Sequence, residues 1–341
     1  MSRVSGFYRW AGPRGLFQLA RLLNRKQPRI LMYHRFSDQA REGFTSAAAF
    51  HAQVRHIKRH YHPLTTAQLV RSLFENEPLP SNAVVITVDD GYQDFHRVAF
   101  PVLQALQVPA TLYVTTGFVD GRLWLWPDQL QWLLAQADPV GQGFRLGPVT
   151  VPAGLHNAVL QGRLAKALVT HCLSLDNTEK NALIGQLADQ LGVTLPKSAP
   201  AGYEAVNWQQ LSELHKAGIE VGGHTQTHPS LGRVPLQQAQ EEIAGCYDAL
   251  VRHLGPAERT FCYPNGQPTD FSPALKPMVK EAGFSGAVLA FPDAVGLRDR
   301  YALRRHGSGE GAFQFHKAIS GLEFLGKRLR RSPKNVAISQ G

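Results

Sequence analysis

The sequence predicts an α/β protein built on parallel strands, and two observations support this prediction. Residues 83–88 (Ala-Val-Val-Ile-Thr-Val) are the apolar, β-branched type of run found in strands buried on both faces of a parallel sheet. Strand-like and helix-like segments alternate at short intervals around this run, which is typical of a parallel sheet or barrel. The 341 residues suffice for one barrel-sized domain or two smaller ones.

Two adjacent carboxylates, Asp89 and Asp90, follow this central strand and precede Gly91. Successive strand side chains point to opposite faces, so both carboxylates can share a site only if the chain turns there. Gly91 permits such a turn. In barrel enzymes the C-terminal ends of the strands hold the catalytic groups. The alternative is an ordinary turn in solvent, and the choice between them depends on a partner further along the chain.

The segments before the central strand follow the same alternation. Residues 29–34 predict a first buried strand that ends in His34, which is either structural or catalytic. Residues 46–60 predict a helix with Ser46 as its N-cap, and a second helix is expected over residues 69–73.

After the carboxylates we expect a helix around residues 98–106 and a strand over residues 110–114. Three tryptophans follow, and they either pack in the core or form a sugar-stacking wall, for which Trp126 is the candidate. Residues 139–200 break the alternation with two helical stretches, at about 157–172 and 178–191. We interpret them as a helical insertion in one domain, because the alternation resumes afterwards.

A pair of histidines, His224 and His228, follows the strand predicted over residues 219–223. Imidazoles four residues apart lie on the same side if the chain makes a helical turn. Together with a carboxylate they form a set that leaves coordination positions open for water and substrate. Since an Asp-Asp-Gly follows one buried strand and a His-x-x-x-His follows another, the sequence predicts a divalent metal site. Zinc is the default ion, and cobalt, nickel or iron also suit nitrogen and oxygen ligands.

Positive charge gathers at the two ends of the chain. Residues 1–30 contain seven Lys or Arg and residues 325–341 contain five, with no acid in either segment. The remainder holds 24 basic and 26 acidic residues, which argues against a nucleic-acid-binding protein with a basic stripe on its fold. No signal peptide or membrane span is visible, so we expect a cytoplasmic protein. The amphipathic stretch around residues 16–23 either docks on the body or lies on anionic lipid at the inner face of the membrane.

Three motif regions resemble, in family order, those of the polysaccharide deacetylases, the NodB-homology family of carbohydrate esterases. The first motif region is residues 84–114 (VVITVDDGYQDFHRVAFPVLQALQVPATLYV), and the second and third motif regions lie within residues 208–266. The segment LMYHRF around His34 also resembles the first strand of many members. The resemblance implies a distorted (β/α) barrel with about seven parallel strands over residues 28–315. Residues 1–27 would then be a basic extension, and residues 316–341 a C-terminal helix and basic tail.

The activity implied is metal-dependent removal of N-acetyl groups from amino sugars of a polysaccharide or lipid-linked glycan. Two alternatives remain: removal of another small acyl group, such as formyl, from a lipid-linked amino sugar, and a non-catalytic glycan-binding protein. The resemblance makes Asp90, His224 and His228 the metal ligands and Asp89 the general base. Tyr263, Pro264 and Asn265, with Trp126, are the expected substrate contacts, and a backbone N–H near them would hold the oxyanion.

The chain departs from the family pattern at two places that affect the site. Many members have an arginine in the third motif where this chain has Cys262, so the arginine that orients Asp89 must come from elsewhere. Arg304 and Arg305 are the candidates, and only one should point inward because strand side chains alternate. The late Leu-x-His motif, which supplies a general-acid histidine, is not clearly present. His306 or His34 could serve instead.

Overall fold

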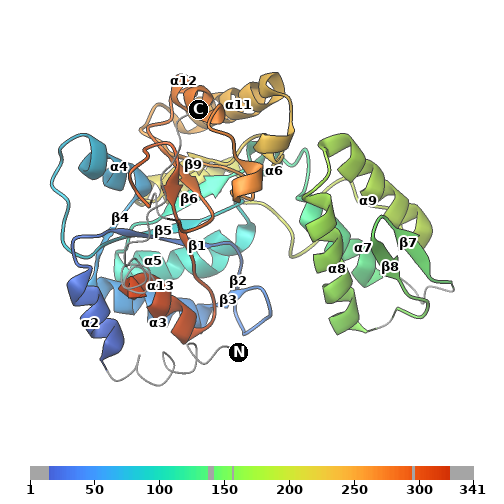
Figure 1. The fold of residues 1–341 in the computed structure, drawn as a ribbon, viewed down its shortest axis with the longest axis horizontal. Helices are drawn as coiled ribbons and strands as arrows, with labels where there is room; N and C mark the ends of the chain where they lie inside the picture. The colour runs from blue at the N-terminus through green and yellow to red at the C-terminus, as the bar shows by residue number, and fades with distance from the viewer. Residues whose placement is uncertain (1–14, 137–141, 156, 294–295, 323–341) are drawn as a thin grey trace, which may run out of the picture.

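The computed structural model describes residues 15–136, 142–155, 157–293 and 296–322. A sheet of parallel strands forms its body (Figure 1). The strands run in the spatial order β12-β11-β10-β9-β6-β5-β1-β13, with β4 added beside β5, and every pairing among them is parallel. They span β1 Arg29–Tyr33, β4 His62–Leu64, β5 Ala83–Val88, β6 Thr111–Val114, β9 Glu220–Gly223, β10 Phe261–Cys262, β11 Ala287–Leu289, β12 Leu303–Arg304 and β13 His306–Gly307.

One continuous stretch, residues 303–307, closes the sheet into a barrel. Its first half pairs with β11, where Leu303 lies opposite Val288. Its second half pairs with β1, where His306 lies opposite Leu31. Because β12 and β13 are separated only by Arg305, they act as a single strand, so seven strands form the closed ring and β4 is an additional strand beside β5. The predicted fold class, a distorted parallel barrel of about seven strands, is confirmed.

Apolar side chains fill the barrel, and helices cover it. Ile30, Val85, Tyr113 and Leu303 pack inside, and α4 closes one end with Leu69 and Val70. A larger apolar layer lies between the outer faces of the strands and the surrounding helices. The helices of this body are α2 Leu16–Leu23, α3 Ala47–His60, α4 Thr66–Phe74, α5 Phe100–Leu106, α6 Thr116–Val119, α10 Trp208–Lys216, α11 Leu236–Leu254, α12 Leu275–Ala282 and α13 Ala312–Ser320, with the short turns η2 Phe95–Ala99, η3 Leu231–Arg233 and η4 Pro268–Asp270.

Local sequence signals explain several of these helix ends. The hydroxyl of Ser46 accepts a hydrogen bond from the Ala49 N–H at 3.2 Å, so Ser46 is the N-cap of α3 as predicted. Thr65 and Gln68 form a capping box at the start of α4. A short parallel pair, β2 Phe36–Ser37 and β3 Thr45–Ser46, lies between β1 and α3.

The insertion has a hydrophobic core of its own and lies to one side of the barrel (Figure 1). It contains α8 Ala158–Cys172 and α9 Asn177–Leu191, close to the two helices expected from the sequence. Two parts were not expected: the antiparallel hairpin β7 Phe144–Leu146 and β8 Val149–Val151, and α7 Trp126–Gln136, which packs in the same core. The insertion therefore begins near residue 126 rather than 139, because the apolar face of α7 is buried against α8 and α9.

The ends of the chain are described only in part. Helix α13 begins at Ala312, four residues before the predicted boundary. Residues 1–14 and 323–341, which hold most of the predicted basic extension and tail, lie outside the described residues. Within the described part of the chain, every helix is too short or too polar to cross a membrane.

Candidate active site

The chain turns sharply after β5, and this turn brings both carboxylates to the end of the barrel. Asp90 has a φ of 78° and Gly91 a φ of 91°, both in the left-handed region. Aspartate tolerates this region better than most residues. A Cβ on Gly91 would lie 3.0 Å from Cγ1 of Val114, so a larger residue would be crowded there as well as strained in its backbone.

Asp89 is held by Arg305, which extends into the barrel from the closing strand. Nη1 of Arg305 donates to Oδ1 of Asp89 at 2.6 Å, and Nη2 donates to Oδ2 at 2.7 Å. The same guanidinium donates to the Thr87 hydroxyl at 3.0 Å and contacts Sγ of Cys262 at 3.1 Å. Burial alone would raise the pKa of Asp89, but the charge and hydrogen bonds of Arg305 outweigh it and hold that pKa below its usual value. Asp89 is therefore ionised at neutral pH.

Arg304, the other arginine predicted for this role, does not reach the site. Its guanidinium donates to the Ala302 carbonyl at 2.6 Å, pairs with Asp293 at 2.9 Å and lies over the ring of Phe291. Side chains alternate along the closing strand, so only one of the two arginines points inward, and that one is Arg305. The thiol of Cys262 on β10 is small enough to leave space for the guanidinium of Arg305, which comes from the closing strand across the barrel interior.

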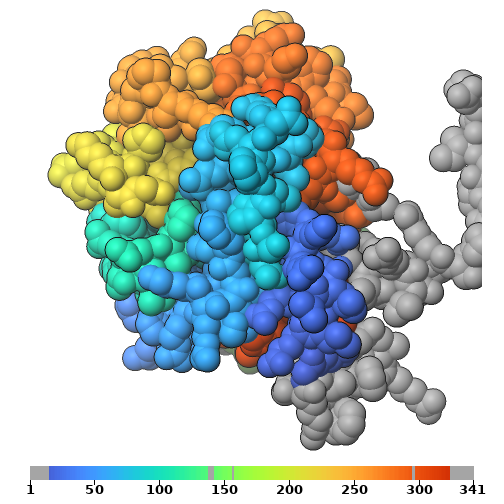
Figure 2. All heavy atoms as spheres, turned by 90° about the vertical axis from the view of Figure 1, so that its left-hand side faces the viewer, coloured from blue at the N-terminus to red at the C-terminus, as the bar shows by residue number. Residues whose placement is uncertain are grey.

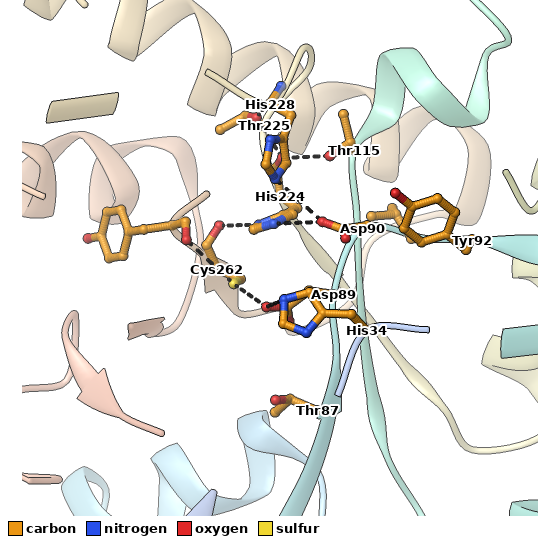
Figure 3. Close-up of polar contacts among 12 residues, drawn as sticks. His34, Thr87, Asp89, Asp90, Tyr92, Thr115, His224, Thr225, His228 and Cys262 are labelled. Carbon is orange, nitrogen blue, oxygen red and sulfur yellow. Dashed lines mark hydrogen bonds and ion pairs between the residues drawn. The ribbon is translucent and has the colours of Figure 1, made fainter. Parts of the chain in front are cut away.

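Asp90, His224 and His228 converge beside Asp89 (Figure 3). Oδ1 of Asp90 lies 3.4 Å from Nε2 of each histidine, and all three side chains are buried. Two ligand atoms bound at about 2.0–2.1 Å in a tetrahedral site are about 3.3 Å apart. Nδ1 of His224 lies 2.7 Å from the Cys262 carbonyl, to which it can only donate, so Nε2 is left as the ligand nitrogen. The donor set therefore fits a divalent cation.

A second group of ligand atoms, from Asp89, His224 and Cys262, also lies close together. It suits a metal less well. Both oxygens of Asp89 already accept hydrogen bonds from Arg305. Burial raises the pKa of the Cys262 thiol, which keeps it protonated, whereas a metal binds the thiolate.

The segment that holds the two histidines is not helical, contrary to the expectation that a helical turn aligns them. Thr225 and His228 have positive φ values of 67° and 60°, and these two residues bend the loop. Glu242 of α11 fixes the bend by accepting hydrogen bonds from the N–H groups of Gln226 and Thr227, both at 2.8 Å. The Thr225 hydroxyl accepts from the His228 N–H at 3.0 Å. Sequence reasoning missed Glu242, because an acid in an amphipathic helix looks like an ordinary surface charge.

His34 lies at the mouth of the barrel (Figure 3). Its Nε2 is 3.7 Å from Oδ2 of Asp89, and 47% of its side chain is exposed. A groove of about 510 Å³ begins there and is lined by His34, Arg35, Phe44 and Glu310 among others. Of the two histidines predicted as general acids, His34 is the one beside Asp89.

His306, the other candidate, faces away from the site. In the barrel register it lies opposite Leu31, whose side chain packs in the layer outside the barrel. Residues paired in register present their side chains on the same face, so the His306 side chain also points outward.

Of the four predicted substrate contacts, two are removed from the site by burial. Tyr263 is fully buried, donates its hydroxyl to the Tyr301 carbonyl at 3.0 Å and its N–H to Val288. Trp126 is 7% exposed in the core of the insertion, with Nζ of Lys180 5.1 Å from its ring centroid. Trp126 therefore packs in the core of the insertion and does not form a sugar-stacking wall.

Pro264 and Asn265 follow Tyr263 at the carboxyl end of β10. Pro264 is buried and has no N–H to offer an oxyanion. Asn265 is half-buried and has a φ of 57°. Its Nδ2 has no partner among the described residues and lines a small cavity shared with Trp126 and Lys180. Asn265 therefore lies between the barrel and the insertion rather than in the groove at His34.

A second polar cluster joins the barrel mouth to the insertion. The guanidinium of Arg35 lies over the ring of Tyr92 at 3.8 Å and pairs with Asp94 at 2.6 Å. The Tyr92 hydroxyl donates to Asp128, in the first turn of α7, at 2.5 Å. Burial raises the pKa of Asp128 to about 6, because the hydrogen bond from Tyr92 and the charge of Arg35 offset only part of the effect.

Solved structures share this fold over most of the chain. A deacetylase from Streptococcus pyogenes, PplD in complex with acetate, superposes with a TM-score of 0.56 at 16% identity, covering 87% of this chain and 97% of that one. IcaB from Ammonifex degensii superposes with a TM-score of 0.55 at 18% identity, covering 86% and 97%. At these identities the likeness shows the fold alone.

The family follows from the sequence. The model of the polysaccharide deacetylase family matches residues 76–141 and 175–287, more than half of the chain, and the chain belongs to that family. A stretch of 60 residues is 45% identical to the poly-β-1,6-N-acetyl-D-glucosamine N-deacetylase of Escherichia coli (strain K12). This stretch covers 18% of the chain but only 9% of that longer relative.

Proposed function

We propose that the protein is a metal-dependent hydrolase that removes N-acetyl groups from amino sugars of a polysaccharide. One observation supports this most directly: the ionised Asp89, held by Arg305, lies next to the ligand set of Asp90, His224 and His228 at the end of the barrel. Family membership supports the amide bond as the target. The short match to a poly-β-1,6-N-acetyl-D-glucosamine N-deacetylase makes that polymer the first substrate to test.

Asp90, His224 and His228 would hold the cation, with zinc as the default and cobalt, nickel or iron as alternatives. A divalent cation in such a site lowers the pKa of water and polarises an acyl oxygen. Asp90 supplies the negative charge of the set, and the Cys262 carbonyl fixes which nitrogen of His224 is free to bind.

Asp89 is the general base in this proposal. It takes a proton from the water that attacks the amide carbon, and such a positioned base contributes roughly 10²–10⁴-fold to the rate. Arg305 keeps the carboxylate ionised and fixes its plane through two hydrogen bonds. Arg305 uses one acceptor position on each oxygen of Asp89, so a further lone pair on each oxygen remains to accept the proton.

His34 is the general acid in this proposal. When the carbon–nitrogen bond of an amide breaks, the departing amine needs a proton. His34 lies 3.7 Å from Asp89 and is exposed toward the groove, so it can deliver a proton where the sugar would lie. His306 cannot, because it faces the outer layer of the barrel.

The experiment is a product assay on purified protein stripped with a chelator and reloaded with zinc, cobalt, nickel or iron. β-1,6-linked N-acetylglucosamine oligomers, β-1,4-linked oligomers and N-formyl analogues are the substrates. We expect acetate and free amine in equal amounts, only after reloading. If formate is released much faster than acetate, the acyl group is wrong. If the loaded protein binds oligomers but releases neither acid, the protein is a glycan-binding protein.

A further inference from the structure

Helix α2 exposes three leucines to solvent. The exposed fractions are 53% for Leu19, 59% for Leu22 and 61% for Leu23. They lie together on an eight-residue helix, and we call them the leucine face. The other large apolar residues with comparable exposure in the described part of the chain, Val159, Leu160 and Leu236, lie on different helices far from α2 in the sequence. Scattered apolar residues on a surface are ordinary, whereas a cluster marks an interaction site.

The opposite face of α2 is fixed to the barrel body. Ala20 is fully buried, and the ring of Phe17 stacks on His316 of α13 with centroids 5.6 Å apart. The Asn24 side chain donates to the Gly321 carbonyl at 3.3 Å just after α13. The helix is therefore docked on the body, the first of the two alternatives considered for this segment, and it still presents its leucine face outward. Figure 2 shows the dark-blue atoms of α2 on the surface of the molecule.

Cations lie on and directly after α2. Arg25 and Lys26 follow α2 and are exposed, and Arg21 lies over the ring of Tyr61 at the end of α3. Beyond Arg21, a groove of about 550 Å³ runs between α3 and α13, and we call it the cationic groove. Its polar lining residues are Gln53, Arg55, His56, Arg59, His60, His316 and Glu310.

The cationic groove has little negative charge of its own. Glu310 is the acid in its lining, and both of its oxygens accept hydrogen bonds from Ser46. His56, His60 and His316 crowd together, with the ring of His56 4.7 Å from each of the other two. Burial and these neighbours, with Arg21, lower the pKa of His56 to about 4. The charged side chains of the groove are therefore Arg55 and Arg59 against the single acid Glu310.

We propose that the leucine face and the cations beside it dock the protein on an anionic phospholipid bilayer. The leucines enter the boundary between headgroups and acyl chains, and Arg21, Arg25, Lys26 and the cationic groove contact lipid phosphates. A free phosphate would not account for exposed leucines. A second copy of the chain fits poorly, because a symmetric pair would bring the same cations together. An anionic bilayer offers acyl chains to the leucine face and phosphate groups to the cations beside it.

Vesicle sedimentation tests the proposal with full-length protein. Phosphatidylcholine vesicles with and without phosphatidylglycerol are compared at low and high salt, about 0.05 M and 0.5 M. We expect binding that requires phosphatidylglycerol. The Arg55→Gln/Arg59→Gln variant should bind about 25-fold more weakly at low salt, since each cation near the surface contributes about fivefold. The variant with serine at positions 19, 22 and 23 should bind more weakly at both salt concentrations, because it loses apolar contact.

Matched controls separate the leucine face from exposed apolar residues in general. Val159→Ser/Leu236→Ser removes two residues of similar exposure elsewhere and should bind like the wild type. As a second measurement, Leu22→Cys labelled with an environment-sensitive dye should shift to the blue on anionic vesicles, whereas labelled Leu236→Cys should not. The three native cysteines are buried, so labelling is selective.

Three results would overturn the docking proposal. The first is no binding of wild-type protein to phosphatidylglycerol vesicles at low salt. The second is equal binding by the wild type and the triple serine variant, with no dye shift at position 22. The third is a wild-type dimer in light scattering that becomes a monomer in the triple serine variant, which would assign the leucine face to a second copy. Vesicle binding needs no catalysis, so it fails or succeeds separately from the deacetylase proposal.

Discussion

The guanidinium of Arg305 donates two hydrogen bonds of nearly equal length, 2.6 and 2.7 Å, to the carboxylate of Asp89, although the two residues are 216 positions apart in the chain. Both side chains are buried, with 1% and 3% of each residue exposed. Removing one partner of a buried ion pair leaves the other charge buried without compensation, which destabilises the folded protein. The orienting group of the site thus comes from the strand that closes the barrel.

Arg305→Met should lose most activity and lower the free energy of unfolding by about 3–5 kcal/mol, because Asp89 is left buried without its cation. Arg304→Met is the matched control, since Arg304 is the adjacent residue but faces Asp293. It should keep its activity, because its guanidinium pairs with Asp293 and the Ala302 carbonyl rather than with Asp89. Urea unfolding and acetate release measure both effects. Activity loss in the Arg304 variant alone would reverse the assignment.

Asp89→Asn should retain metal and lose roughly 10²–10⁴-fold in turnover, because an amide cannot accept the proton. Metal content by elemental analysis and turnover at saturating metal separate the two roles. Wild-type rates would make Asp89 a structural partner of Arg305. Loss of the metal together with activity would instead place Asp89 among the ligands.

His228→Ala should weaken zinc binding by well over 10- to 100-fold, because it removes one of the three proposed direct ligands. A loss of roughly 10- to 100-fold in metal affinity is typical when the mutated residue only hydrogen-bonds to a ligand. Competition with a chromogenic chelator measures the affinity. His253→Ala is a suitable control, because His253 stacks on Trp208 with centroids 4.1 Å apart and has no place in the ligand set. Unchanged affinity in the His228 variant would remove it from the site.

His34→Gln should reduce turnover of an N-acetylated sugar by roughly 10²–10⁴-fold, because the departing amine must be protonated. The same variant should hydrolyse an activated aryl acetate at close to the wild-type rate, since that leaving group needs no proton. His306→Gln should leave the ratio of the two rates unchanged. Equal losses on both substrates in the His34 variant would assign His34 a role other than general acid.

Asp128 should make the stability depend on pH. Its pKa of about 6 in the folded protein exceeds the value near 3.9 of an unfolded chain, so the folded state binds more protons between these values. Relative to Asp128→Asn, the wild type should therefore gain on the order of 2–3 kcal/mol as the pH falls from about 7 to about 4. Urea unfolding across this range tests it, with the exposed Asp38→Asn as a control. If the difference in free energy of unfolding between the wild type and Asp128→Asn does not change with pH, the raised pKa of Asp128 is contradicted.

The sequence carries enough information to predict the barrel and the convergence of Asp90, His224 and His228. Unbroken apolar runs such as residues 83–88 identify strands buried on both faces, and polar residues at their carboxyl ends converge because parallel strands end at the same edge. The alternation of side chains along a strand correctly predicts that only one of Arg304 and Arg305 points into the barrel. Which of the two points inward depends on the register with which the closing strand pairs with β11 and β1.

Other features depend on tertiary packing and could not be read from local patterns. Tyr263 follows the third-motif strand like a site residue, yet its ring fills the layer outside the barrel. The hairpin β7–β8 consists of two three-residue strands, too short to show a period of two. The loop from His224 to His228 is bent by left-handed residues that the His-x-x-x-His spacing does not reveal.

The closing strand has a consequence for how the protein matures. The ribosome releases residues 303–307 only after almost all of the barrel has been made, and until then Asp89 has no counter-charge. A nascent chain that already holds Asp90, His224 and His228 could capture a cation but would lack an oriented base. The oriented base would then form in one late step, together with completion of the barrel, so a chain that ends before residue 303 would lack hydrolytic activity.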